Sequence, residues 1–204
     1  MLQVQNLAAR RGDELLFSEL SFSVAPGAAL LVSGPNGSGK TTLLRILAGL
    51  THPADGTVRW RGEAVRPFDP RSRAETLFVA HIPALKDELT ALENLAALAS
   101  LHGSKATHEQ LRAALGGWSV SRQSGLPARV LSQGQRRRVG LARLRLVERA
   151  LWLLDEPATA LDEAGIATLC TTVGEHLAVG GLAVIATHHP LELASGVVHT
   201  LRLA

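Results

Sequence analysis

The segment GPNGSGKT, residues 34–41, constrains the fold of this chain more than any other feature. It follows a short apolar run, 29–32, and precedes a stretch of helical periodicity, 42–50. The pattern G-x-x-x-x-G-K-[ST] turns backbone N–H groups inward and places a helix N-terminus behind them, which favours bound phosphate oxygens. A chance glycine-rich turn is the alternative, but here strand, loop and helix patterns occur together. The sequence therefore predicts a phosphate-binding loop between a buried strand and a helix.

Two side chains of this loop carry the chemistry that a bound nucleotide needs. The Lys40 ammonium can reach the β- and γ-phosphates, and the Thr41 hydroxyl can ligate Mg²⁺. The residues before them form the expected cradle: Gly34, Pro35, Asn36, Gly37, Ser38 and Gly39.

Three short apolar runs, 29–32, 151–154 and 182–186, alternate with helical patterns along the chain. Such runs are typical of parallel strands that are buried on both faces of a sheet. Each run ends at polar residues, and ligands of open α/β sheets bind at the carboxyl ends of the strands. We therefore expect one site where these three runs end.

Two smaller parts are predicted beside this α/β core. Short strand patterns separated by turn residues occur at 3–8, 20–24 and 57–61. From about 85 to 149 the apolar residues have helical spacing, and Thr90 begins a capping-box pattern. We interpret this middle stretch as a helical subdomain inserted into the core.

The paired carboxylates Asp155 and Glu156 end the second apolar run. Asp155 is suitably placed to hold Mg²⁺, usually through water, and Glu156 to polarise an attacking water. Two solvated carboxylates at a strand end are the alternative. The phosphate loop in the same chain favours the functional interpretation.

Composition excludes several other classes of protein. A hydrophobic fraction of 46% with 19% charged residues indicates a globular chain rather than a disordered one. The net charge of +3 is too small to indicate nucleic-acid binding, and the single cysteine, Cys170, provides no disulfide and is expected to be buried. The strongest apolar candidate for a span, 177–186, is too short and contains two glycines, so membrane contact would need another chain.

A second glycine motif, LSQGQ at 131–135, opens a helix expected over 136–148. Ser132 and Gln135 have capping-box spacing, so a well-capped helix is the simplest interpretation. A capped helix with Gly134 in its first turn is also an anion site. The sequence leaves both interpretations open.

At this point a family resemblance becomes specific. LSQGQRRRVGLARL resembles the signature motif of ATP-binding cassette (ABC) ATPases, whose usual form is LSGGQ. LLDEP follows it, TALD at 159–162 is similar to the D-loop, and His188 is similar to the switch histidine. The resemblance implies an α/β P-loop NTPase fold with a RecA-like parallel sheet, a small antiparallel β part and an inserted helical subdomain. It also implies one domain over 1–204, divided into a nucleotide-binding core, 1–82 and 150–204, and a helical subdomain, 83–149.

The resemblance further implies an ATPase that works as a homodimer with two ATP molecules sandwiched between its subunits. The catalytic residues would be Lys40, Glu156 and His188, and the Mg²⁺ ligands Thr41 and Asp155. One subunit would bind ATP through the phosphate loop and Thr42, and the other through Ser132, Gly134 and Gln135. Asp162 would communicate between the two sites.

Three further segments, KDELTALENL, LDEPATALDEAG and ATHHPL, resemble the ATPase subunits of haem exporters in bacterial cytochrome c biogenesis. That resemblance implies a transmembrane partner like CcmB, with CcmC, CcmD and CcmE as further partners and no nucleic acid. It implies a peripheral position on the cytoplasmic side of the inner membrane. The alternatives are the ATPase of another ABC exporter, a soluble ABC ATPase without transport, and a P-loop kinase.

Two positions depart from the general ABC pattern. The Q-loop glutamine of the family aligns with Ile82, which cannot ligate a cation; His81 could substitute, or the site could tolerate the loss. The adenine-stacking aromatic aligns with Arg11, whose guanidinium could stack or simply be solvated.

Other charged and aromatic residues are assigned structural roles. The arginines at 136–138, 143, 145 and 149 are expected to form a solvated helix face, with some stems packing and some charge near the nucleotide; contact with a partner or with anionic headgroups is the alternative. His189 is expected in an exposed loop, and the three tryptophans in packing positions.

Overall fold

A computed structural model describes residues 1–193 and 195–204, which fall into two compact units. The first unit comprises 1–78, 149–156 and 173–204. The second comprises 79–148 and 157–172. The three predicted apolar runs and the helix after the phosphate loop belong to the first unit, and the helices of the predicted insertion belong to the second.

A five-stranded sheet has the order β6-β7-β8-β3-β9, and its β7–β8, β8–β3 and β3–β9 pairs are parallel. The three predicted apolar runs are confirmed as β3 (Ala28–Ser33), β7 (Leu151–Asp155) and β8 (Leu182–Ala186). All residues of β7 and β8 are buried, as expected for central strands covered on both faces. The sequence analysis missed β6 (Thr76–Val79) and β9 (Val197–Arg202), because one is very short and the other is largely exposed.

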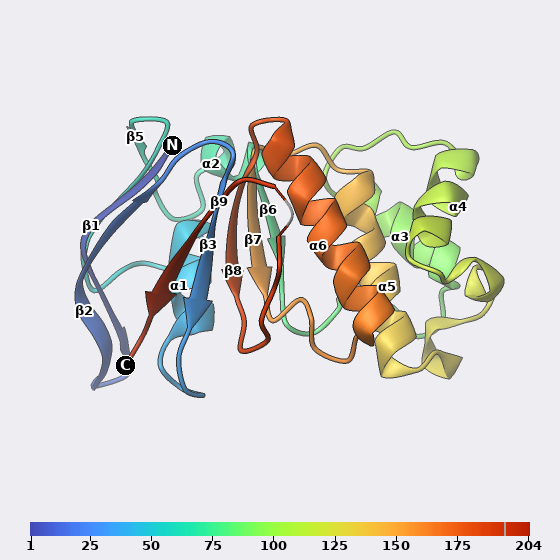
Figure 1. The fold of residues 1–204 in the computed structure, drawn as a ribbon, viewed down its shortest axis with the longest axis horizontal. Helices are drawn as coiled ribbons and strands as arrows, with labels where there is room; N and C mark the ends of the chain where they lie inside the picture. The colour runs from blue at the N-terminus through green and yellow to red at the C-terminus, as the bar shows by residue number, and fades with distance from the viewer. Residues whose placement is uncertain (194) are drawn as a thin grey trace. The chain divides into compact units, whose positions relative to one another are not determined.

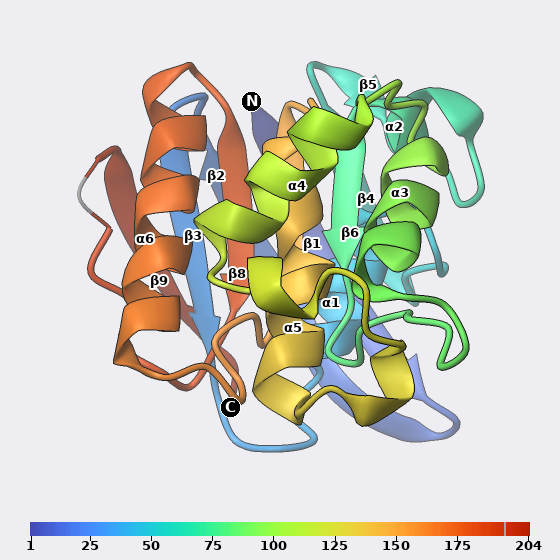
Figure 2. The same cartoon turned by 90° about the vertical axis from the view of Figure 1, so that its right-hand side faces the viewer.

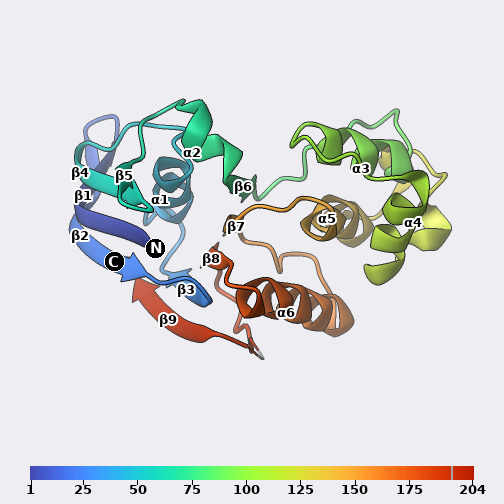
Figure 3. The same cartoon turned by 90° about the horizontal axis from the view of Figure 1, so that it is seen from above.

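A second, antiparallel sheet has the order β2-β1-β4-β5. Its strands are β1 (Leu2–Arg11), β2 (Glu14–Val24), β4 (Asp55–Trp60) and β5 (Glu63–Ala64). Figures 1 and 3 show helix α1 (Lys40–Leu47) between this sheet and the parallel one. Its buried residues Leu43, Leu44 and Leu47 share one core with both sheets, which fixes the helix behind the phosphate loop.

The second unit contains α3 (Ala91–Ser100), α4 (His108–Gly117) and α5 (Gln133–Ala142), which pack against one another (Figure 2). Capping boxes at Thr90, Thr107 and Ser132 start these three helices. The helix expected over 136–148 is shorter than predicted, because a 3₁₀ turn, Arg143–Arg145, follows Ala142. The remaining helices are the short α2 (Pro70–Ala74) and α6 (Glu163–Ala178), and two more 3₁₀ turns are Ser121–Gln123 and Ala128–Val130.

The expected solvated face of arginines is wrong for two of its members, although Arg145 is exposed as expected. Arg137 and Arg143 are only 3% and 8% exposed. Arg136 and Arg138 are half-buried and form ion pairs with Asp87 and Asp162. Sequence periodicity did not indicate this, because a guanidinium that finds enough acceptors can be buried where a pattern of charges predicts exposure.

Within the described residues, no helix combines the length and apolarity needed to cross a membrane. Cys170 is buried, as predicted, and so are Trp60, Trp118 and Trp152.

Trp152 stacks flat on His176, with ring centroids 3.8 Å apart and planes 1° apart. His176 is buried, and its Nε2 lies 3.2 Å from the carbonyl oxygen of Leu182. Burial lowers the pKa of His176 below its ordinary value of 6.5, and the hydrogen bond to Leu182 opposes this only in part.

This buried histidine predicts a pH dependence of stability. Because its folded-state pKa is lowered, the unfolded chain binds more protons between that pKa and pH 6.5, and stability falls as the pH drops through this window. Replacing His176 with glutamine should flatten the dependence in that window. Urea unfolding at pH 8, 6.5 and 5 measures it, with the exposed His52→Gln as the matched control. Equal acid sensitivity of His176→Gln and the unmodified chain would contradict this assignment.

Candidate nucleotide site

The phosphate loop joins β3 to α1, and its backbone requires glycine at specific positions. Gly34, Gly37 and Gly39 have φ values of 147°, 91° and 95°, which side-chain-bearing residues rarely adopt. A Cβ on Gly34 would lie 2.6 Å from the Leu203 carbonyl oxygen, and one on Gly39 would touch Phe17. The loop therefore curls closely against its own unit, with Lys40 as the first helical residue.

Polar groups of this loop fit an anionic ligand. The Lys40 ammonium donates to the carbonyl oxygens of Gly34 and Pro35 at 2.8 and 3.0 Å, so it lies over the loop rather than in solvent. The Ser38 hydroxyl is buried and has no hydrogen-bond partner among the described residues. A buried cation and a buried hydroxyl in a glycine-rich loop before a helix N-terminus are the groups that would bind a polyphosphate.

Asp155, at the end of β7, meets the phosphate loop directly. The Thr41 hydroxyl donates to its Oδ2 at 2.9 Å, and Asp155 is only 2% exposed. A hydroxyl and a carboxylate beside a phosphate cradle are the hard oxygen donors that Mg²⁺ prefers. These two residues fit the predicted metal site.

Glu156 has a strained backbone conformation, with φ at 47°. Its N–H donates to the Ala186 carbonyl oxygen at 2.8 Å, so the end of β8 holds this conformation in place. The side chain is mostly buried, and its Oε2 lies 2.9 Å from Nδ1 of His188. Backbone strain at a carboxylate next to a phosphate loop is typical of a functional residue.

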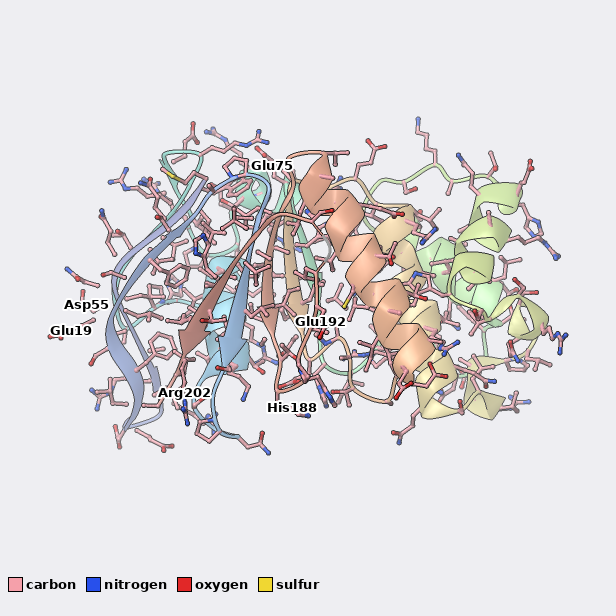
Figure 4. All side chains as sticks on the ribbon, viewed as in Figure 1. Glu19, Asp55, Glu75, His188, Glu192 and Arg202 are labelled. Atoms are coloured by element: carbon pink, nitrogen blue, oxygen red, sulfur yellow. The ribbon has the colours of Figure 1, made fainter. Side chains whose placement is uncertain are left out.

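His188 lies beyond the carboxyl end of β8, where Figure 4 labels it, and its side chain is 60% exposed. Thr187 makes the turn that presents it: the Thr187 hydroxyl accepts from the His189 N–H at 3.0 Å. The sequence analysis gave Thr187 no role, although threonine before a loop histidine could have indicated such a turn. The first unit therefore brings together the phosphate loop, Asp155, Glu156 and His188, as the strand ends predicted.

The signature residues lie at the N-terminus of α5, in the second unit. The Ser132 hydroxyl accepts from the Gln135 N–H at 3.2 Å, and the Gln135 side chain accepts from the Ser132 N–H at 2.9 Å. A Cβ on Gly134 would lie 2.7 Å from the Ala160 carbonyl oxygen, so this position requires glycine. Gln133, where the usual motif has glycine, is exposed and has room for its side chain.

Asp162, in the D-loop segment, caps α6 and pairs with α5. Its Oδ1 accepts from the Gly165 N–H at 2.8 Å and from the Arg138 guanidinium at 2.5 Å. The Gly165 N–H contributes most to lowering the pKa of this carboxyl, and Arg138 adds to it. Sequence reasoning missed Arg138, which links the signature helix to the D-loop.

The other predicted positions have fewer contacts. Arg11 is exposed at the end of β1, in the turn to β2, and Ile82 is 77% exposed after β6. His81 is exposed, whereas His189 is half-buried and its ring lies 4.3 Å from that of His188.

Comparisons with known proteins agree with this geometry. Residues 17–159 match the family described as ABC transporter. A protein named cytochrome c biogenesis ATP-binding export protein CcmA from Aromatoleum aromaticum is 49% identical over 95% of this chain and 91% of its own length. The protein of the same name from Nitrosomonas europaea is 46% identical over 100% of this chain and 96% of its own.

Solved structures show the same fold. A protein from Pyrococcus furiosus assigned as the ATP-binding protein of an ABC transporter superposes with a TM-score of 0.85 at 26% identity, over 98% of this chain and 96% of its own. The ATP-binding cassette MJ0796, solved as a dimer bound to ADP and Pi, gives 0.80 at 25% identity, over 93% and 88%. With the phosphate loop, the carboxylate pair and the signature helix in place, this chain belongs to the ABC transporter family and is one of its ATP-hydrolysing subunits.

Proposed function

We propose that this chain is the ATPase subunit of a CcmAB-like complex in the biogenesis of c-type cytochromes. The observation that carries the proposal is near-complete coverage, at 45–50% identity, of several relatives named CcmA. In this role ATP hydrolysis powers haem export or the release of the haem chaperone CcmE on the far side of the membrane.

The first unit supplies the hydrolytic groups in this proposal. Lys40 and the loop amides bind the β- and γ-phosphates, and Glu156 accepts a proton from the attacking water. His188, within hydrogen-bonding distance of Glu156, orients that carboxylate and contacts the γ-phosphate. Thr41 and Asp155 would hold Mg²⁺, which neutralises charge on the phosphates when it is bound.

The signature residues would act on the ATP of a second copy. Ser132 is exposed at the N-terminus of α5, where the capping box holds the first turn of the helix. The partial positive charge of such an end favours a phosphate group. The dimeric cassette MJ0796 supports a sandwich of two subunits around the nucleotides.

The proposed partner at the membrane is a CcmB-like transmembrane subunit, with CcmC, CcmD and CcmE as further components, and the chain would be peripheral on the cytoplasmic side of the inner membrane. Arg11 is kept only as a candidate for adenine stacking, and the exposed Ile82 as a surface residue at the Q-loop position.

Co-expression tests this function. The chain should sediment with membranes and co-purify with a CcmB-like subunit, and it should stay in the supernatant when that subunit is omitted. The purified complex should release phosphate from ATP without an added acceptor, which separates it from a kinase. Unchanged fractionation with and without the subunit would contradict the proposal and favour a soluble ABC ATPase.

A further inference from the structure

Arg137 is a buried cation in the middle of the signature helix α5, with 3% of its surface exposed. Burying a guanidinium is unfavourable unless hydrogen bonds replace its hydration. Arg137 donates from Nε to the carbonyl oxygen of Pro157 at 3.2 Å. From Nη1 it donates to the carbonyl oxygens of Ala80 and His81 at 3.1 and 2.7 Å.

These acceptors belong to two segments that leave the strands of the parallel sheet. Ala80 and His81 directly follow β6, and Pro157 directly follows Glu156 at the end of β7. Along the sequence, the chain leaves the first unit and enters the second after Phe78 and again after Glu156, so each segment lies just after such a boundary. The planar Arg137 guanidinium therefore hydrogen-bonds to both of these connecting segments at once.

Close packing fixes the first of these segments on α5 a second time. A Cβ on Gly140 would lie 3.3 Å from Cβ of Pro83, so the helix and the segment after β6 already touch. A cavity of only about 10 Å³ lies beside Arg137, between α5 and this segment. The guanidinium has little room to shift, and its bonds are held at defined positions.

The charge of Arg137 also affects the pKa of a second buried arginine, Arg143. Burial, and then the positive charge of Arg137, lower the pKa of Arg143 to about 10. The helix and the 3₁₀ turn that follows it thus keep two buried cations near each other. Apolar residues would fill these positions without the electrostatic cost.

We propose that Arg137 is a positioning residue for hydrolysis. It holds the Pro157 carbonyl at a fixed place beside the segment after β6, and thereby holds the strained backbone of Glu156. The inference rests on the proposed role of Glu156 as the general base. The Glu156–Pro157 peptide bond is planar and the proline ring fixes φ of Pro157, so only ψ of Pro157 can rotate between its carbonyl and the backbone that carries the Glu156 carboxylate. Because φ of Glu156 is 47°, its backbone is in a strained conformation that persists only while the surrounding structure holds it, and losing that support would let it relax.

Substituting Arg137 with glutamine tests this role in the full chain, purified with its membrane subunit. We expect kcat for ATP hydrolysis to fall on the order of 10- to 100-fold, as for a misplaced catalytic group, with KM within about twofold. Arg137→Lys keeps the charge but replaces two separate donor nitrogens with one, so it should lose kcat to an intermediate extent. Val139→Ala, a buried change on the same helix, controls for loss of stability alone and should leave kcat unchanged at a temperature where all variants are folded.

A double-mutant cycle separates positioning from a general structural effect. If Arg137 acts through Glu156, Arg137→Gln should cause no further loss of hydrolysis when Glu156 is already glutamine. An equal loss in both backgrounds, an unchanged kcat, or a loss matched by Val139→Ala would overturn the inference. If Glu156→Gln alone hydrolyses ATP at the normal rate, the proposed general base is wrong, and that outcome is distinct from failure of the Arg137 proposal. Should Arg137→Gln not fold, Arg137→Lys alone decides: a normal kcat overturns the inference.

Discussion

Replacing Glu156 with glutamine should slow ATP hydrolysis by about 10²- to 10⁴-fold, the range expected when a general base is removed. The amide keeps the size of the side chain and can still hydrogen-bond to His188, but it cannot accept a proton from water. The fold should therefore be unchanged, and ATP binding should persist. Single-turnover measurement of phosphate release gives the rate directly.

The same variant should accumulate an ATP-bound dimer, because ATP joins two copies and hydrolysis no longer separates them. Size-exclusion chromatography with Mg²⁺ and ATP should show this species, and ADP should not produce it. Glu163→Gln, a change at the start of α6 outside the site, is the matched control and should hydrolyse normally. Normal turnover by Glu156→Gln would refute its assignment as the base.

Replacing Lys40 with alanine should weaken ATP binding by roughly 10- to 100-fold, since hydrogen bonds to a charged group contribute about 1.5–3 kcal/mol. In the structure Lys40 is 8% exposed and its ammonium donates to carbonyl oxygens of the phosphate loop, so its charge is concentrated at the cradle. Hydrolysis should fall because less of the protein has ATP bound. It should also fall when ATP is saturating, because the γ-phosphate loses the positive charge of Lys40.

Fluorescence titration with a labelled ATP analogue measures this affinity. Lys86→Ala removes an equivalent charge from the exposed surface of the second unit and should bind normally. Equal affinity of Lys40→Ala and the unmodified chain would contradict the role of the phosphate loop.

The site could be predicted from sequence where local pattern and topology coincide. The phosphate loop needs glycine for its φ angles, and the apolar runs before Ser33, Asp155 and Thr187 fix which ends of the parallel sheet carry polar groups. The capping box at Ser132 was equally visible, because it depends only on spacing along one helix.

Features that depend on tertiary packing could not be predicted. The arginines of α5 have the pattern of a solvated face, yet Arg137 is buried because acceptors 20 positions away in one direction and 56 and 57 in the other converge on it. The edge strand β9 was missed because its residues are mostly exposed and alternate poorly. The strained φ of Glu156 leaves no trace in composition or periodicity.

Mixing two inactive variants tests the shared site most directly. Lys40→Ala impairs the phosphate loop, and Ser132→Arg blocks the signature end of α5. If each ATP lies between the loop of one copy and the signature of another, a mixed dimer keeps one intact site. The mixture should then regain hydrolysis that neither variant shows alone, in proportion to the mixed dimer formed. If the mixture stays as inactive as its parts while mixed dimers are present, or if Ser132→Arg alone hydrolyses ATP normally, the nucleotide is not bound between two copies in this way.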